Sequence, residues 1–325
     1  MSTKIRAVLS ALLAFALALT IAACGGDDEG SGGESSGGGE GGGQLIENNP
    51  DNKGKAITVG SKNFTEQYVL GNIYSEALER AGYDVKRELN LGSEVVAFKA
   101  LKQGEIDAYP EYTGTALTSF YKVKVTDVPK DQQEAFDQVK TELEGDQITA
   151  LPPTPFENTY RLGMTKEKAE EAGNPTKISD LEGKSEDLSI SGYPECRQRP
   201  DCLLGVEDTY GLKFKKFVAN ESPYEVLDTG AADVAFIFTT DANLVTDKYQ
   251  VLDDDKKLFP PYNISFMIRN DALEKLGPDA QDVIERVQEP LTEDVMAELN
   301  SRVDLDKKKP EDVAVEYLRE SGFIE

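Results

Sequence analysis

The residues from Asp107 to Thr115, DAYPEYTGT, crowd two tyrosine rings and two carboxylates around a proline. Residues of these types could do two kinds of chemistry. The faces of aromatic rings attract cations, whereas a carboxylate pair such as Asp107 and Glu111 could act as in a glycosidase. Both carboxylates lie close to the same proline, and the chain contains no histidine and shows no activated nucleophile. These features disfavour an enzyme.

The chain is strongly acidic, with 60 Asp and Glu residues against 35 Lys and Arg residues and a formal net charge of −25. A protein that binds nucleic acid needs basic surface to neutralise phosphates, so we expect no nucleic-acid partner. The acidity is compatible with simple solubility, and it could also attract cationic ligands.

Residues 1–23 are typical of a secretory signal. A positively charged start precedes an apolar stretch from Val8 to Ala18, and two alanines come directly before Cys24. The segment IAAC resembles a bacterial lipobox, which implies cleavage before Cys24 and attachment of lipid to its sulfur. A secreted protein without lipid and an uncleaved anchor helix are the alternatives, and the short apolar core disfavours the anchor.

Residues 24–54 begin with the lipidated cysteine and continue as Gly, Ser and acidic residues. A stretch of this composition has too few apolar side chains to offset the entropy lost on ordering, so it is expected to be a flexible tether. No later segment approaches the ~18 consecutive apolar residues that a membrane span needs. We therefore expect an extracytoplasmic protein that is lipid-anchored to the outer face of the cell membrane.

The other two cysteines, Cys196 and Cys202, lie six positions apart. In an oxidising compartment this spacing predicts a local disulfide. Two thiols without any histidine disfavour a zinc site, and we expect no metal and no cofactor.

Strands alternate with helices along the rest of the chain, which predicts an α/β architecture. The segment from Lys55 to Gly92 reads as strand, helix and strand, with Asn63 as the helix N-cap, Glu66 as its capping-box partner and Gly82 at the helix end. A second helix closes at Gly104, and a strand follows it into the opening segment. Open α/β sheets bind ligands at the carboxyl ends of such strands.

About 270 residues are too many for one simple core and suit two lobes. Prolines near residues 152–155 indicate a crossover between them. We predict that residues 55–153 and 250–325 form lobe 1, that residues 154–249 form lobe 2, and that a cleft lies between the lobes.

Two motifs, VGSKNFTEQYVLGNIYSEALE and NLGSEVVAFKALKQGEIDAYPEYTGTALTSFY, closely resemble the substrate-binding proteins of osmoprotectant ABC importers. The stretches ENTYRLGM, GVEDTYGLKF, VAFIFTTDA and LDDDKKLFPPYN follow in the family's order, so the resemblance covers Lys55 to Glu325. It implies a two-lobed, type II-like periplasmic-binding-protein clamshell that binds glycine betaine, choline or carnitine. It also implies that the protein delivers this ligand to permease subunits that work with a cytoplasmic ATPase. The protein is then expected to be a monomer and not an enzyme.

A trimethylammonium head has no N–H to donate, so aromatic ring faces are its natural partners. The resemblance assigns Tyr109 to the cage, with Asp107 contributing a carbonyl or charge, and it makes Tyr68, Tyr160 and Tyr193 further candidates. Phe238 stands where many relatives have tyrosine, which keeps a ring face and loses a hydroxyl. The other rings, at Tyr74, Tyr112, Tyr210 and Phe214, are expected to serve packing.

Polar contacts are expected from Gln67, Asn63 and Thr113. The family sequences carry Arg-Pro-Asp in the segment PECRQRPDC, so Arg199, rather than Arg197, is the candidate for a ligand carboxylate, which a guanidinium fork matches. The sequence does not rank the quaternary ammonium compounds. A receptor or sensor domain for another small polar solute is the alternative function.

Overall fold

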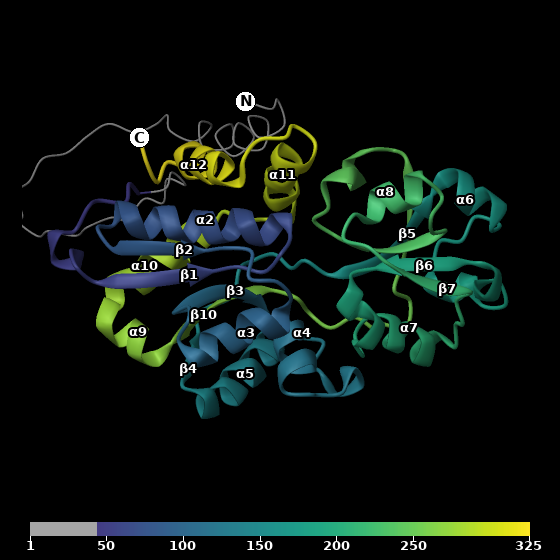
Figure 1. Ribbon diagram of the computed structural model, residues 1–325, viewed down its shortest axis with the longest axis horizontal. Coiled ribbons are helices and arrows are strands. Elements are labelled where there is room, and N and C mark those ends of the chain that lie inside the picture. The colour runs from purple at the N-terminus through teal and green to yellow at the C-terminus, as the bar shows by residue number, and fades with distance from the viewer. Residues whose placement is uncertain (1–43) are drawn as a thin grey trace, which may run out of the picture. The chain divides into compact units, whose positions relative to one another are not determined.

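The computed structural model describes residues 44–325 (Figure 1). The predicted signal at residues 1–23, the lipidation at Cys24 and most of the predicted tether lie outside these residues. The last part of the predicted tether is folded, which corrects the expected boundary at residue 54. The Ile46 amide donates to the carbonyl of Phe323, and the buried Asn52 side chain donates to the carbonyl of Ala81.

Two five-stranded mixed sheets form the centres of two lobes, with the strand orders β2-β1-β3-β10-β4 and β7-β6-β8-β5-β9. The strands of the first sheet are β1 (Ala56–Gly60), β2 (Asp84–Glu88), β3 (Ala108–Tyr112), β4 (Ile148–Ala150) and β10 (Ile264–Arg269). Those of the second are β5 (Tyr160–Thr165), β6 (Ser189–Gly192), β7 (Lys216–Ala219), β8 (Val234–Phe238) and β9 (Tyr249–Leu252). In each sheet the fourth strand in this order, β10 or β5, is antiparallel to both of its neighbours and so runs opposite to the other four.

Each antiparallel strand directly follows a crossover between the sheets. The chain leaves the first sheet after β4 and enters the second at β5, and it returns between β9 and β10. Because β9 pairs with β5, the second lobe extends past the predicted boundary at residue 250. The two lobes share one topology, because β7, β6, β8, β5 and β9 take the places that β2, β1, β3, β10 and β4 take in the first sheet.

The first lobe contains α2 (Thr65–Arg80), α3 (Glu94–Gln103), α4 (Thr113–Thr115), α5 (Gln132–Leu143), α9 (Asn270–Leu276), α10 (Pro278–Gln288), α11 (Glu293–Asp304) and α12 (Pro310–Glu320). The second contains α6 (Lys166–Glu171), α7 (Leu203–Tyr210) and α8 (Pro223–Asp228). In Figure 1, α2 and α12 lie on one face of the first sheet, and α3 and α5 lie on the other. Apolar side chains of these helices pack onto both faces of the sheet, so its central strands β3 and β10 are buried, whereas the edge strand β2 is not.

Helix α2 forms where the sequence predicts it, but its N-cap is Phe64 rather than Asn63. Phe64 has an extended backbone and no side-chain cap, and the carboxylate of Glu66 turns inward instead of closing a capping box. The predicted helix end at Gly104 is confirmed, because this glycine caps α3 with a φ of 73°, a left-handed conformation that glycine adopts without strain.

Among residues 44–325 no helix combines the length and the apolar composition needed to cross a membrane. Within the same residues no group of three or more acidic or cysteine side chains is placed to hold a metal ion.

Candidate ligand-binding site

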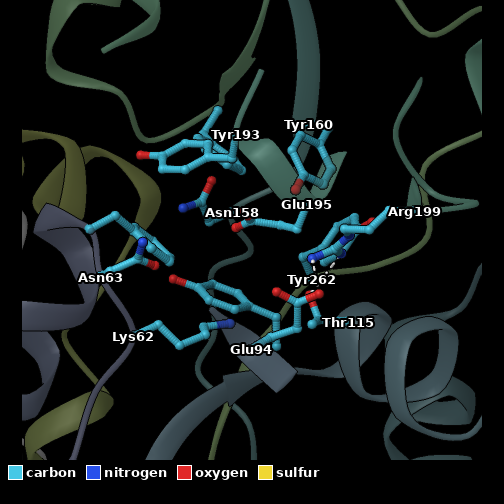
Figure 2. A pocket seen from close by; sticks show the side chains of 13 residues that line it. Lys62, Asn63, Glu94, Thr115, Asn158, Tyr160, Tyr193, Glu195, Arg199 and Tyr262 are labelled. Carbon is cyan, nitrogen blue, oxygen red and sulfur yellow. Dashed lines mark hydrogen bonds and ion pairs between the residues drawn. The ribbon is translucent and has the colours of Figure 1, made fainter. Parts of the chain in front are cut away.

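A cavity lies between the two lobes, with about 470 Å³ of space that is partly open to solvent. Both lobes and both crossovers contribute to its wall (Figure 2). The lining residues are Lys62, Asn63, Phe64, Glu94, Tyr112, Thr115, Asn158, Tyr160, Tyr193, Glu195, Arg199, Phe238 and Tyr262.

Aromatic rings from both lobes converge on this cavity. Phe64 of the first lobe lies 6.1 Å from the ring of Tyr112, 6.1 Å from that of Phe238 and 6.4 Å from that of Tyr193, measured between centroids. Tyr160 lies 4.8 Å from Phe238. The rings thus form one cluster that bridges the lobes.

The ends of strands position these rings. Tyr112 is the last residue of β3 and Phe238 is the last residue of β8, and Tyr193 directly follows β6. All three strands are parallel members of their sheets, so their carboxyl ends open toward the cleft, as in other α/β proteins.

A lysine ammonium already lies against two of the rings. Lys62 Nζ is 4.3 Å from the ring centroid of Tyr112 and 5.7 Å from that of Phe64. The same ammonium forms a buried ion pair with Glu111. The ring faces in this cavity are therefore arranged to receive positive charge.

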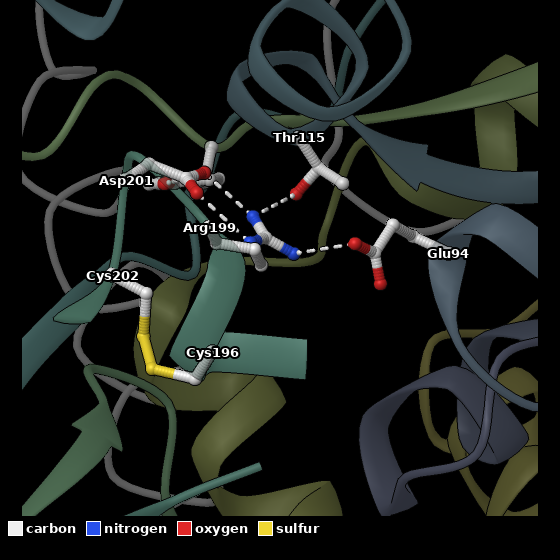
Figure 3. Close-up of a disulfide and its surroundings, with 7 residues drawn as sticks. Glu94, Thr115, Cys196, Arg199, Asp201 and Cys202 are labelled. Atoms are coloured by element: carbon white, nitrogen blue, oxygen red, sulfur yellow. Dashed lines mark hydrogen bonds and ion pairs between the residues drawn. A yellow bond between two sulfur atoms is a disulfide. The ribbon is translucent and has the colours of Figure 1, made fainter. Parts of the chain in front are cut away.

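The guanidinium of Arg199 is held by an internal carboxylate (Figure 3). Its Nε and Nη2 donate to both oxygens of Asp201, at 2.9 and 2.6 Å. It also reaches across the cleft, because Nη2 donates to Thr115 at 3.3 Å and Nη1 lies 3.4 Å from a Glu94 oxygen. Burial alone would raise the pKa of the Asp201 carboxyl, but the guanidinium beside it holds this pKa below its ordinary value.

Figure 3 also shows the disulfide between Cys196 and Cys202, whose Cα atoms are 5.3 Å apart. It closes the short segment that carries Arg199. The bond therefore restrains the backbone on both sides of this arginine.

Glu195 lines the cavity near Glu94. Burial, with a smaller contribution from the negative charge of Glu94, raises the pKa of the Glu195 carboxyl above its ordinary value. An ionised carboxylate here would gain from a cation in the cavity.

The carboxylate of Glu66 lies behind the cavity and accepts four hydrogen bonds. It is 2% exposed, and its four donors are the hydroxyl of Tyr112 (2.7 Å), the amide of Asn158 (2.9 Å), the hydroxyl of Thr240 (2.6 Å) and the amide of Asn300 (3.2 Å). Thr240 belongs to the second lobe and Tyr112 to the first. One buried carboxylate therefore ties a cavity ring to the opposite lobe.

Several residues that the sequence predicted as ligand contacts do line the cavity, namely Asn63, Tyr160, Tyr193, Arg199 and Phe238. Asn63 donates to Glu221 of the second lobe at 3.4 Å instead of capping α2. Arg199 lines the cavity as expected, but Asp201 already accepts hydrogen bonds from its Nε and Nη2.

The position of Tyr109 contradicts its predicted contact with a ligand in this cavity. Its side chain is fully buried in the cluster between the first sheet and helices α3 and α5. Its hydroxyl donates to Glu111 at 2.9 Å. Tyr112, which the sequence assigned to packing, lines the cavity instead.

The remaining predicted contacts also lie off the cavity wall. Asp107 accepts the Thr58 amide at 2.8 Å, between β1 and the start of β3. The buried Gln67 accepts the Lys62 amide at 3.1 Å, and Thr113 donates to the carbonyl of Pro261 at 3.0 Å. Tyr68 is half-buried on α2.

Sequence reasoning missed Lys62, Phe64, Glu94, Tyr112, Thr115, Asn158, Glu195 and Tyr262. A usable signal existed for Tyr112, because it is the last residue of its strand. No local signal existed for Glu94 or Tyr262, whose neighbours come from distant parts of the chain.

A model of the substrate-binding domain of the ABC-type glycine betaine transport system matches residues 55–320. The chain belongs to this family. The match spans both lobes and the whole cavity wall.

Similar proteins support the assignment to this family. The chain is 32% identical over 286 residues to the glycine-betaine-binding protein of Pseudomonas aeruginosa, covering 84% of this chain and 90% of that protein. It is 30% identical over 273 residues to the ergothioneine transport permease/ergothioneine binding protein EgtU of Helicobacter pylori, covering 83% of this chain and 48% of that protein. A crystal structure described as a glycine betaine/carnitine/choline ABC transporter superposes with a TM-score of 0.64 and 26% identity, covering 81% of this chain and 97% of that one.

The predicted family and the two-lobed clamshell are therefore confirmed. As a substrate-binding protein of an ABC importer, this family member works outside the cytoplasm, with a small ligand and a permease as its partners.

Proposed function

We propose that this protein binds a quaternary ammonium osmoprotectant, such as glycine betaine, choline or carnitine, in the cavity between its lobes and delivers it to the permease. The observation that carries this proposal is the ring cluster of Phe64, Tyr112, Tyr193 and Phe238, which comes from both lobes. The names of similar proteins, a glycine-betaine-binding protein among them, support it.

The physical reason lies in the chemistry of the head group. A trimethylammonium group cannot donate a hydrogen bond, and it gains about 0.5–2 kcal/mol from each ring face that it contacts, the more so when desolvated. Lys62 Nζ, 4.3 Å from the Tyr112 centroid, shows that these faces accept a cation within this protein.

Ligand binding would favour the closed arrangement of the lobes, because a ligand among these rings contacts both. Hydrogen bonds across the cleft, from Thr240 to Glu66 and from Thr118 to Asp201, would add to closure. The permease would then read the closed state.

The cellular setting belongs to the same proposal. The IAAC sequence supports lipidation of Cys24, and residues up to about 45 would tether a monomeric domain to the outer face of the membrane. Catalysis forms no part of this function, because the cavity offers ring faces and paired charges rather than a nucleophile with its base.

Isothermal titration calorimetry on the purified full chain tests the proposal. Choline, glycine betaine and carnitine are compared with glycine, which has no methyl groups on its nitrogen. At least one methylated compound should bind, and glycine should not. Failure of all three methylated compounds would refute the proposed function.

A matched pair of variants tests the role of the rings. Tyr193→Leu removes one ring face and should weaken binding about 2- to 30-fold, the equivalent of about 0.5–2 kcal/mol. Tyr193→Phe keeps the face and should bind almost as the wild type does, since the Tyr193 hydroxyl makes no hydrogen bond among residues 44–325. Equal losses in the two variants would speak against a contact with the ring face.

A further inference from the structure

Both positive charges on the cavity wall are neutralised from inside the protein. Lys62 pairs with the buried Glu111. Arg199 forms a bidentate pair with Asp201, and Nη1 points toward Glu94 at 3.4 Å. A ligand carboxylate would therefore compete with an internal carboxylate for either partner.

Two hydrogen-bond acceptors on the wall, by contrast, receive no hydrogen bond from the side chain of any other described residue. No side chain among residues 44–325 donates to the Glu195 carboxylate. Asn158 is 4% exposed, and its Nδ2 donates to Glu66, so Oδ1 is fixed as its acceptor atom. This Oδ1 has no hydrogen-bond partner within the described part of the chain. Figure 2 shows both residues among the side chains that line the cavity.

The charged residues around the cavity also favour a cation, because more of them are acidic than basic. Lys62 and Arg199 are the basic residues on the wall, and Glu94 and Glu195 are the acidic ones. Behind the wall stand the carboxylates of Glu111, Asp201 and Glu66, which contact wall residues directly. Acids outnumber bases, so this environment favours a net cation and opposes an anionic group.

We propose that the cavity selects a quaternary ammonium alcohol, of which choline is the simplest, over zwitterions that carry a carboxylate. In this arrangement the ligand's hydroxyl donates its single proton to Glu195, which is the main determinant of specificity, and Asn158 Oδ1 adds a partial negative charge to the same wall. The inference rests on the proposed function, since it assumes that the rings hold the quaternary head.

Calorimetry on the purified full chain tests this selection with four ligands: choline, the methyl ether of choline, glycine betaine and tetramethylammonium. Choline should bind at least about 10-fold more tightly than glycine betaine. The methyl ether keeps the charge and loses the donor, so it should bind about 10-fold more weakly than choline, as for a lost hydrogen bond to a charged group.

The variant Glu195→Gln then tests whether Glu195 sets the preference for choline over glycine betaine or only attracts any cation. It should lower the ratio of choline affinity to glycine betaine affinity about 10-fold. Glu225→Gln, an exposed acid of the second lobe away from the cavity, should leave the ratio unchanged.

Each contrary outcome has one meaning. Glycine betaine binding as tightly as choline, or a methyl ether equal to choline, would overturn the inference and leave the proposed function intact. A ratio that Glu195→Gln does not change would overturn the role of Glu195. Silence from all four ligands would overturn the inference, and silence from carnitine as well would overturn the proposed function itself.

Discussion

Replacing Glu66 by glutamine should destabilise the protein far more than an ordinary surface substitution. The wild-type carboxylate accepts hydrogen bonds from Tyr112, Asn158, Thr240 and Asn300, at 2.6–3.2 Å, while 2% exposed. Glutamine keeps one acceptor oxygen but presents an NH₂ group where the second oxygen stood. The donor from Asn300 then faces another donor, since the Thr240 hydroxyl can rotate, whereas a flip of the Asn300 amide would break its hydrogen bond to the Thr240 carbonyl.

The magnitude follows from these contacts. A hydrogen bond to a charged group contributes about 1.5–3 kcal/mol, and a buried donor left unpaired costs about 1–3 kcal/mol. We therefore expect Glu66→Gln to lower the free energy of unfolding by about 2–4 kcal/mol. For a domain of this size the melting temperature should fall by about 4–15 °C.

The assay is urea denaturation followed by circular dichroism, with Glu79→Gln as the control. Glu79 lies on the same helix and pairs with Arg87 at the surface, so its loss should cost less than about 1 kcal/mol. Equal unfolding free energies for the two variants would refute the reasoning that Glu66 is a buried, fully bonded link between the lobes.

Three further predictions concern other parts of the molecule. Tyr112→Leu should weaken choline binding about 2- to 30-fold. Because it also removes a donor to Glu66, it should lower the free energy of unfolding by about 1.5–3 kcal/mol. Tyr109→Leu should lower stability and leave affinity almost unchanged; calorimetry and urea denaturation measure the two effects, and a larger affinity loss at Tyr109 would contradict the assignment. Burial raises the pKa of Asp241 to about 7, so the folded state binds its proton more tightly than the unfolded chain does. The free energy of unfolding should then fall by up to about 4 kcal/mol as the pH rises from about 4 to about 7. Asp241→Asn should remove this dependence on pH. An unchanged dependence in that variant would show that other groups cause it. Replacing Cys196 and Cys202 by serine should lower the free energy of unfolding by about 2 kcal/mol for so short a loop, and an unchanged urea midpoint would contradict that.

The fold was largely predictable because its signals are local. Alternation of strands and helices, with Gly104 at a helix end, is written in neighbouring residues. Alternation alone did not decide between Tyr109 and Tyr112; the usable signal was the position of Tyr112 at the end of β3. All five residues of β3 are buried, so an inside–outside alternation cannot decide which ring reaches the cavity.

The polar contacts of the site depend on tertiary structure alone. Lys62 pairs with Glu111, which is 49 residues away, and Glu66 receives Asn300 across 234 residues. Nothing in the helical pattern around Glu66 distinguishes it from a capping-box acid. The N-cap prediction for Asn63 failed because it also relied on this local pattern. The packing of α11 and of a crossover against α2 brings Asn300 and Asn158 to Glu66, whereas Lys62 meets Glu111 because β1 and β3 are neighbours in the sheet.

The central claim is that ring faces in this cavity hold a positive charge. The most direct measurement is calorimetry on the purified full chain with choline and with its uncharged isostere, in which a quaternary carbon replaces the nitrogen. Both ligands have the same shape and the same hydroxyl. The account predicts that choline binds and that the isostere binds at least about 30-fold more weakly, the equivalent of about 2 kcal/mol for a desolvated cation on aromatic faces. Equal affinities would show that the cavity recognises shape and apolar surface, and would contradict the account.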